Sequence, residues 1–154
     1  MLRKVLYGFL AVIVIALIAI QFFQPEKNES PVNENEIVYH VEIPELVKKT
    51  LVASCYDCHS NHTRYPWYGH IAPVSWLLDS HIRNGKENLN FSEWGTYSKR
   101  KQIGLLDEIC EVTADRSMPL KGYVKLHKEA IIHDHDIRDI CEWAEIAAEQ
   151  MFGD

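Results

Sequence analysis

The stretch Cys55-Tyr56-Asp57-Cys58-His59 has the C-x-x-C-H spacing that is typical of covalent haem attachment. Two cysteines at this spacing on a helical turn can each add a thiol across one vinyl group of a haem, which forms two thioether bonds. The histidine that follows then lies under the iron and can offer its imidazole as the proximal ligand. Cys55 and Cys58 are therefore predicted to hold one haem c, with His59 as the first axial ligand.

Three other uses of this cysteine pair fit the rest of the sequence less well. A zinc site would need a second Cys or His pair at metal-ligand spacing, and Cys110 and Cys141 each stand alone. A thioredoxin-like redox pair would lie near a βαβ pattern, and no alternating run of β-branched residues precedes Cys55. A disulfide between Cys55 and Cys58 would leave the adjoining His59 without a role. The sequence therefore favours haem attachment.

The N-terminal segment is basic at its start and then apolar. Arg3 and Lys4 precede residues 5–23, an uncharged run that is long enough at helical rise to cross a bilayer core. A cleaved signal peptide is the alternative, but the run is longer than a usual signal core and ends without an A-x-A site. Residues 1–24 are predicted to be an uncleaved membrane anchor, with the basic end inside and the rest of the chain exported.

A flexible linker is predicted over residues 25–41, which are rich in Glu and Asn and have little apolar surface to bury. The folded domain, residues 42–154, is small for a hydrophobic core unless a large apolar group is packed inside it. The first 24 residues hold two of the chain's 16 basic residues and none of its 22 acidic ones, so the remainder has a formal charge of −8. Nucleic acid is therefore not expected as a partner.

The periodicity of the domain is helical nearly throughout, which predicts an all-α fold. A helix that starts at Pro44 leads into Cys55. The polar and aromatic residues 60–68 follow as an irregular loop, because Pro66 restricts the residue before it. A second helix is expected over residues 73–88. Its inward stripe has apolar or histidine side chains at helical spacing, namely Val74, Leu77, Leu78, His81 and Ile82.

Two further helices complete the predicted domain. One follows Ser98, and the last runs from about Asp134 to Phe152. Their inward stripes contain Cys110 and Cys141, respectively. In an oxidising compartment these two cysteines can form a disulfide, and two buried thiols fit the same placement.

The haem of an electron carrier needs a second axial ligand from a distant part of the chain, usually Met sulfur or His nitrogen. Met118 is the candidate, because Met1 is out of reach and Met151 falls on the stripe of the last helix. Met118 lies in a loop that Pro119 stiffens, although a methionine that fills a gap in the core fits the same position. His81 is the alternative ligand, but a histidine on an apolar stripe is more often a hydrogen-bonded core residue.

Together these residues resemble the small, membrane-anchored haem-binding domain proteins related to monohaem cytochromes c. The likeness covers roughly residues 43–144 and includes the N-terminal anchor. It is carried by Cys55 to Asn61, Thr63, Tyr65 to Tyr68, Pro73-Val74, Asn90 to Trp94, Met118-Pro119 and Tyr123 with His127.

The resemblance implies that Cys55 and Cys58 take the thioethers, that His59 is the proximal ligand and that Met118 is the distal ligand. It also implies haem attachment outside the cytoplasm of a bacterium, so we expect a single-pass inner-membrane protein with its haem domain on the periplasmic side. The chain departs from the family at residues 133–136, where His-Asp-His-Asp stands in place of a Ser-x-x-Asp helix start. Asp134 is expected to replace the serine as the helix cap.

The sequence thus predicts a small cytochrome c-like helical domain around one covalent haem, preceded by one transmembrane helix. The expected function is electron transfer through a His/Met-ligated haem rather than enzyme catalysis, with a linker that lets the domain swing between redox partner proteins. The alternative is an open-site haem protein, either a peroxide-handling enzyme or a ligand sensor, with His81 or Arg64 on the distal side. An enzyme would need a placed acid-base pair, and the sequence shows none.

Overall fold

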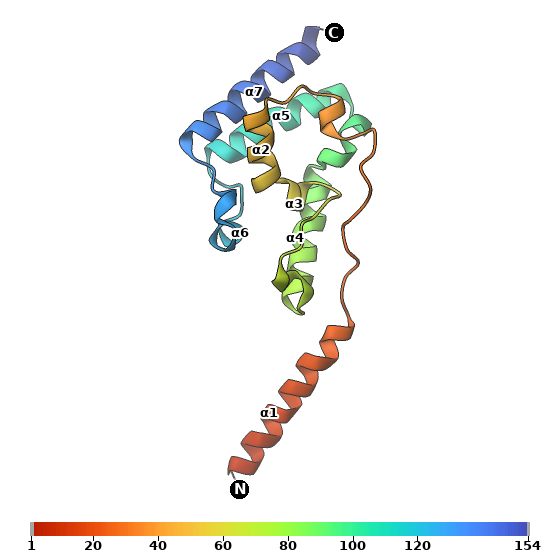
Figure 1. Cartoon of the computed structure of the whole chain (residues 1–154), viewed down its shortest axis with the longest axis vertical. Helices are drawn as coiled ribbons and strands as arrows, with labels where there is room; N and C mark the ends of the chain where they lie inside the picture. The colour runs from red at the N-terminus through yellow and green to blue at the C-terminus, as the bar shows by residue number, and fades with distance from the viewer. Residues whose placement is uncertain (1, 154) are drawn as a thin grey trace.

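The computed structural model describes residues 2–153 and is built from helices joined by short connections (Figure 1). No strand is found within this range, so the prediction of an all-α fold is confirmed. The α-helices are α1 (Leu2–Ala19), α2 (Glu45–Ser54), α3 (Tyr56–His59), α4 (Val74–Asn88), α5 (Lys99–Ala114), α6 (Lys121–Leu126) and α7 (Asp134–Gly153). Short 3₁₀ helices are η1 (Ile20–Phe22), η2 (Ile37–Tyr39), η3 (Trp67–His70), η4 (Phe91–Thr96) and η5 (Lys128–Ala130).

The N-terminal helix projects from one end of the domain (Figure 1). The span Leu2–Phe22 has a mean hydropathy of 2.7, and none of it is buried inside the protein. The 18 residues of α1 rise by about 27 Å at 1.5 Å per residue, close to the roughly 30 Å of a bilayer's hydrocarbon core. The helix could therefore span a membrane, and a signal sequence has the same features.

The core of the domain lies mainly where α5 packs along α7, with α2 against α7. Leu106 of α5 and Ile140 of α7 are fully buried. A disulfide between Cys110 and Cys141 joins the same two helices, which answers the question that the sequence left open. The disulfide therefore links the two helices that form the main part of the core.

The predicted start of the last helix is correct, but its predicted cap is wrong. The backbone N–H of His133 donates to the carboxylate of Asp136 at 2.8 Å, which is the reach-back bond of a capping box. Asp134 already lies inside the helix, and its carboxylate pairs with Arg116 instead. Asp136 rather than Asp134 therefore satisfies the free backbone donor.

The predicted inward stripe of α4 is also wrong for most of its members. Ile82 is buried, but Val74, Leu77 and His81 are exposed, and Leu78 is half-buried. The helix lies at the edge of the domain (Figure 1), where its neighbours cover one side of it. Periodicity shows that a helix has an apolar stripe but does not show what will cover it.

Residues 25–41 lie against the domain, which differs from the free linker that their composition predicts. Asn28 donates from its side-chain amide to the Ser60 carbonyl at 2.7 Å, and the Ser30 N–H donates to the Asn61 carbonyl at 2.9 Å. Ile37 of η2 is fully buried in the core. The contacts are chiefly backbone and amide hydrogen bonds, which hydrophobic patterning does not reveal.

Replacing Ile37 by alanine tests whether this segment belongs to the folded domain. We expect Ile37→Ala to lower the free energy of unfolding by about 2–5 kcal/mol, because the truncation leaves a cavity in the core. Val32→Ala in the same segment, where the side chain is 63% exposed, should stay within about 0.5 kcal/mol of the parent. Thermal unfolding of the full-length protein followed by circular dichroism measures both. Equal, small effects would show that the segment stands free.

Candidate functional site

The C-x-x-C-H motif forms a single helical turn directly after α2. Cys55 leaves helical geometry, with φ −124° and ψ −41°, and separates α2 from α3. Its carbonyl then accepts hydrogen bonds from the N–H groups of Cys58 at 3.1 Å and His59 at 2.9 Å. The change of direction at Cys55 turns both thiols and the imidazole toward one space.

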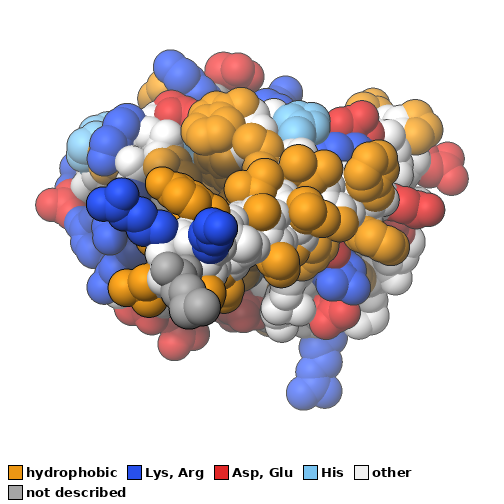
Figure 2. Space-filling model, turned by 90° about the horizontal axis from the view of Figure 1, so that it is seen from below, with side chains coloured by type: hydrophobic (Ala, Val, Ile, Leu, Met, Phe, Trp, Pro, Cys, Tyr) orange, Lys and Arg blue, Asp and Glu red, His pale blue; other side chains and the backbone are white. Residues whose placement is uncertain are grey.

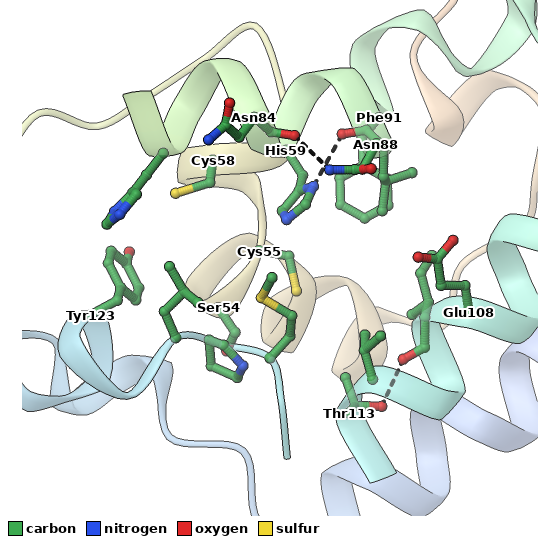
Figure 3. A pocket seen from close by; sticks show the side chains of 18 of the residues that line it. Ser54, Cys55, Cys58, His59, Asn84, Asn88, Phe91, Glu108, Thr113 and Tyr123 are labelled. Atoms are coloured by element: carbon green, nitrogen blue, oxygen red, sulfur yellow. Dashed lines mark hydrogen bonds between the residues drawn. The ribbon is translucent and has the colours of Figure 1, made fainter. Parts of the chain in front are cut away.

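That space is a cavity of about 500 Å³, within the usual range for cofactor pockets. Cys55, Cys58 and His59 line it from the motif, and Tyr123 lines it from α6 (Figure 3). Most of the remaining wall is apolar, formed by Leu89, Phe91, Leu105, Ile109, Val112, Pro119 and Leu120. A large apolar group with a metal at its centre matches this volume and lining.

His59 is held in the orientation and protonation state that a metal ligand needs. Its Nδ1 lies 3.1 Å from the carbonyl oxygen of Leu89, at the end of α4. Because a carbonyl can only accept, Nδ1 carries the proton and Nε2 keeps its lone pair. Burial lowers the pKa of His59, which favours the neutral ring. Nε2 is therefore free to coordinate iron.

The pKa values of the two motif thiols are raised, so little thiolate is present at neutral pH. Burial, with the neighbouring Cys58, raises the pKa of Cys55 to about 12, and burial with Asp57 raises that of Cys58 to about 11. A thioredoxin-like pair needs a lowered thiol pKa, so these thiols do not fit that chemistry. Within residues 2–153 no cluster of three His, Cys, Asp or Glu side chains is placed to hold a metal ion.

Asp57, inside the motif, anchors the turn to the segments on either side of it. Its buried carboxylate accepts from the Arg64 backbone N–H at 3.1 Å, from Arg64 Nε at 3.0 Å and from the Tyr123 hydroxyl at 2.6 Å. Arg64 donates to Asp57 through Nε and Nη2 and does not line the cavity, so it is not placed to serve a distal site. The sequence analysis assigned no role to Asp57, because one of its partners, Tyr123, lies 66 residues away in the chain.

Tyr123 is positioned by a second set of contacts from the loop after α6. The ring of His127 stacks on that of Tyr123 with centroids 4.2 Å apart. His127 Nε2 lies 2.7 Å from the Tyr68 hydroxyl, and its Nδ1 lies 3.1 Å from Glu129. In the sequence Tyr123 and His127 were singled out by the resemblance. In the structure Tyr123 lines the cavity, and His127 stacks on its ring from outside the cavity wall.

Both predicted candidates for the second axial ligand line the same cavity as His59. Met118 follows α5 and is half-buried, and its backbone N–H donates to the Val112 carbonyl at 3.0 Å, which ties the loop to the helix end. His81 lies on α4 and is exposed. The structure therefore brings Cys55, Cys58, His59 and Met118 together around one space, with His81 at its rim.

The close packing of α4 on the motif depends on a glycine that the sequence reasoning did not single out. A β-carbon at Gly85 would lie 2.6 Å from the Cys58 carbonyl oxygen and 3.3 Å from the Cys58 Cβ. No side chain fits in that gap, so glycine is required for the approach. The same approach brings the end of α4, and with it the Leu89 carbonyl, to His59.

The residues present fit a haem: two thiols, a neutral imidazole with a free Nε2, a thioether and apolar walls surround one cavity. A small helical domain with such a site defines a haem-binding protein. The family model described as a haem-binding domain matches residues 15–146, and the chain belongs to this family. No curated protein and no solved structure was found to match the chain.

Substituting Gly85 tests the contact between α4 and the motif. Gly85→Ala should lower the free energy of unfolding by about 1–3 kcal/mol, because the backbone of Cys58 cannot move aside cheaply. Gly104→Ala on α5 is the matched control, since a β-carbon there meets nothing within 4 Å. It should raise stability by about 0.5–1 kcal/mol through helix propensity. Chemical denaturation measures both, and a gain at both positions would contradict the close packing.

Proposed function

We propose that the protein is a membrane-anchored, c-type cytochrome-like electron carrier with one covalent haem. Cys55 and Cys58 hold the haem by thioether bonds, and His59 and Met118 are its axial ligands. The observation that carries this proposal is that Met118, distant from the motif in sequence, lines the same cavity as the motif. An electron carrier needs both axial positions filled from the protein, and a cavity lined by both His59 and Met118 supports this proposal.

The bound haem supplies one-electron chemistry through the ferric and ferrous states of its iron. The residues of the chain set the conditions for that chemistry. Leu89 keeps the His59 imidazole in one tautomer and orientation, which limits rearrangement when an electron arrives. The apolar wall excludes water and favours the less charged ferrous state, and a thioether ligand such as Met118 raises the reduction potential further.

The proposed location is the periplasmic side of a bacterial inner membrane, with α1 as a single-pass anchor. The helix is apolar and wholly exposed, as a lipid-facing helix is. The disulfide between Cys110 and Cys141 supports an oxidising compartment for the domain. Redox partner proteins at or near that membrane would supply and accept the electron.

Removal of both motif cysteines tests covalent attachment. A haem-stained denaturing gel of the parent protein should show one band at the mass of the intact chain, in the membrane fraction. Cys55→Ala with Cys58→Ala should abolish this staining, because no thiol remains to form a thioether. His133→Ala, at an exposed site outside the cavity wall, should stain like the parent. Staining that survives the double substitution would disprove covalent attachment, and a shorter, soluble band would identify α1 as a cleaved signal.

Substitution of Met118 tests the carrier against an open-site haem protein. Met118→Ala should keep its covalent haem but lose the sulfur-to-iron charge-transfer band of the ferric protein. Its reduction potential should fall, because the thioether that favours ferrous iron is gone. Imidazole and carbon monoxide should bind much faster than to the parent. Absorption spectroscopy, a redox titration and stopped-flow mixing measure these three changes.

His81→Ala is the matched control, because His81 lines the same cavity. It should leave the spectrum, potential and ligand-binding rates close to those of the parent. If His81→Ala opens the iron and Met118→Ala does not, the haem has two histidine ligands. If the parent already binds external ligands freely, the site is open, and a peroxide-handling enzyme or a ligand sensor replaces the carrier.

A further inference from the structure

We propose that the face formed by Trp67, Ile71, Val74, Trp76 and Leu77 docks on the lipid surface beside α1. This set is called the docking face below. Lipid docking is a role beyond electron transfer. The inference rests on the proposed function in one respect, which is the placement of α1 in a bilayer. The occupant of the face is the headgroup region of that same bilayer.

The docking face is apolar and uncovered by the fold. Trp67 is 76% exposed and Leu77 is 59% exposed, whereas Ile71, Val74 and Trp76 are between 40% and 44% exposed. All five lie on η3, on the first turn of α4 or between them. A cluster of this kind is unusual on a water-facing surface and marks a site that contacts a partner or a membrane. Val74 and Leu77 are exposed members of the predicted stripe of α4.

Hydrogen bonds join this part of the domain to the end of the N-terminal helix. The side-chain amide of Gln21 donates to the Ala72 carbonyl and accepts from the Ala72 N–H, both at 3.0 Å. The indole N–H of Trp76 donates to the carbonyl of Phe23 at 2.6 Å. The start of α4 therefore lies at the level of residues 21–23, at the end of η1.

That level is where a bilayer would end. If α1 crosses the hydrocarbon core, its length of about 27 Å leaves Gln21 and Phe23 at the boundary with the headgroups. Tryptophan is enriched at this boundary, because its ring is apolar and its N–H is polar. In Figure 1, η3 and the start of α4 are the part of the domain next to the end of α1. Figure 2 views the molecule from this side with α1 nearest the viewer, so the hydrophobic side chains that it shows include those of α1.

The linker holds the docking face in place. Lys27 donates to the Gly69 carbonyl at 3.0 Å, and its ammonium group lies 3.8 Å from the centre of the Tyr65 ring. The Asn28 N–H donates to the Tyr65 hydroxyl at 2.8 Å, and Lys86 of α4 donates to the Asn28 side chain at 2.6 Å. These contacts fix the segment after α1 against η3 and α4. In this proposal the domain therefore lies on the membrane and does not swing on a free tether.

Lipid photolabelling of the full-length haem protein tests the docking face. The protein is placed in vesicles of phosphatidylcholine and phosphatidylglycerol that contain a phosphatidylcholine with a diazirine near the glycerol end of one acyl chain. After illumination, mass spectrometry maps the labelled residues. We expect labels on α1 and on residues 67–77. Leu46, Leu126 and Ile146, exposed apolar side chains elsewhere on the domain, should carry background labelling only.

Paired variants sharpen the test. Trp67→Glu with Leu77→Glu should lower labelling of residues 67–77 several-fold and leave labelling of α1 unchanged. Leu46→Glu with Leu126→Glu, at similarly exposed sites on other faces, should label like the parent. Circular dichroism and the haem absorption spectrum of the same samples should match the parent in both cases, because all four side chains lie outside the cavity wall.

The outcomes separate this inference from the carrier proposal. Labels on α1 alone would overturn the docking face and leave the anchor intact, and labels on neither would overturn both. Concentration-dependent crosslinks between copies through residues 67–77 would also overturn lipid docking, in favour of self-association. The absorption spectrum reports the ligation by His59 and Met118 independently of any labelling, so loss of the carrier proposal leaves the docking result standing.

Discussion

The contact between α4 and the motif turn is the constraint on which the site depends. Without a side chain at Gly85, the helix approaches the backbone of Cys58 more closely than any other residue would permit. That approach carries the end of α4 to His59, where the Leu89 carbonyl accepts the imidazole proton. One missing β-carbon thus controls both the position of a thiol and the orientation of the proximal ring. Asp57 holds the other side of the turn through Arg64 and Tyr123.

A haem that fills the cavity would account for the stability of so small a domain. The densest packing lies between α5 and α7, which the disulfide also joins, and the motif turn lies beside this wall rather than within it. A cavity of about 500 Å³ is large for a protein interior, whose voids seldom exceed a water molecule. A haem-binding protein of this size therefore contributes only part of its own core, and the cofactor contributes the remainder.

The polar contacts of the linker favour a domain that stays next to the end of α1 over one that moves on a free tether. A flexible tether would let the domain diffuse between partners, whereas hydrogen bonds from Gln21, Lys27 and Asn28 keep it against the end of α1. In the carrier proposed above, a haem held at a fixed height above the bilayer would favour electron exchange with a partner in or on the same membrane.

Local signals in the sequence were enough for the helical class, the approximate bounds of α2, α4 and α7, the start of α5, and the residues of the motif. These features depend on neighbours along the chain, such as the 3.6-residue period and the spacing of Cys55, Cys58 and His59. Met118 could be named by elimination, since the chain has three methionines, but its place in the cavity wall depends on how α5 and α6 pack.

Other features became visible only in three dimensions, because they arise between segments far apart in sequence. The pairing of Cys110 with Cys141, the exposure of Val74 and Leu77 and the burial of Ile37 all depend on what packs against each residue. Gly85 and Asp57 look ordinary in sequence, and their roles come from a close backbone approach and from partners brought in by folding. Periodicity reports which side chains share a face, whereas the tertiary structure sets which faces are covered by protein and which are left for a cofactor or a membrane.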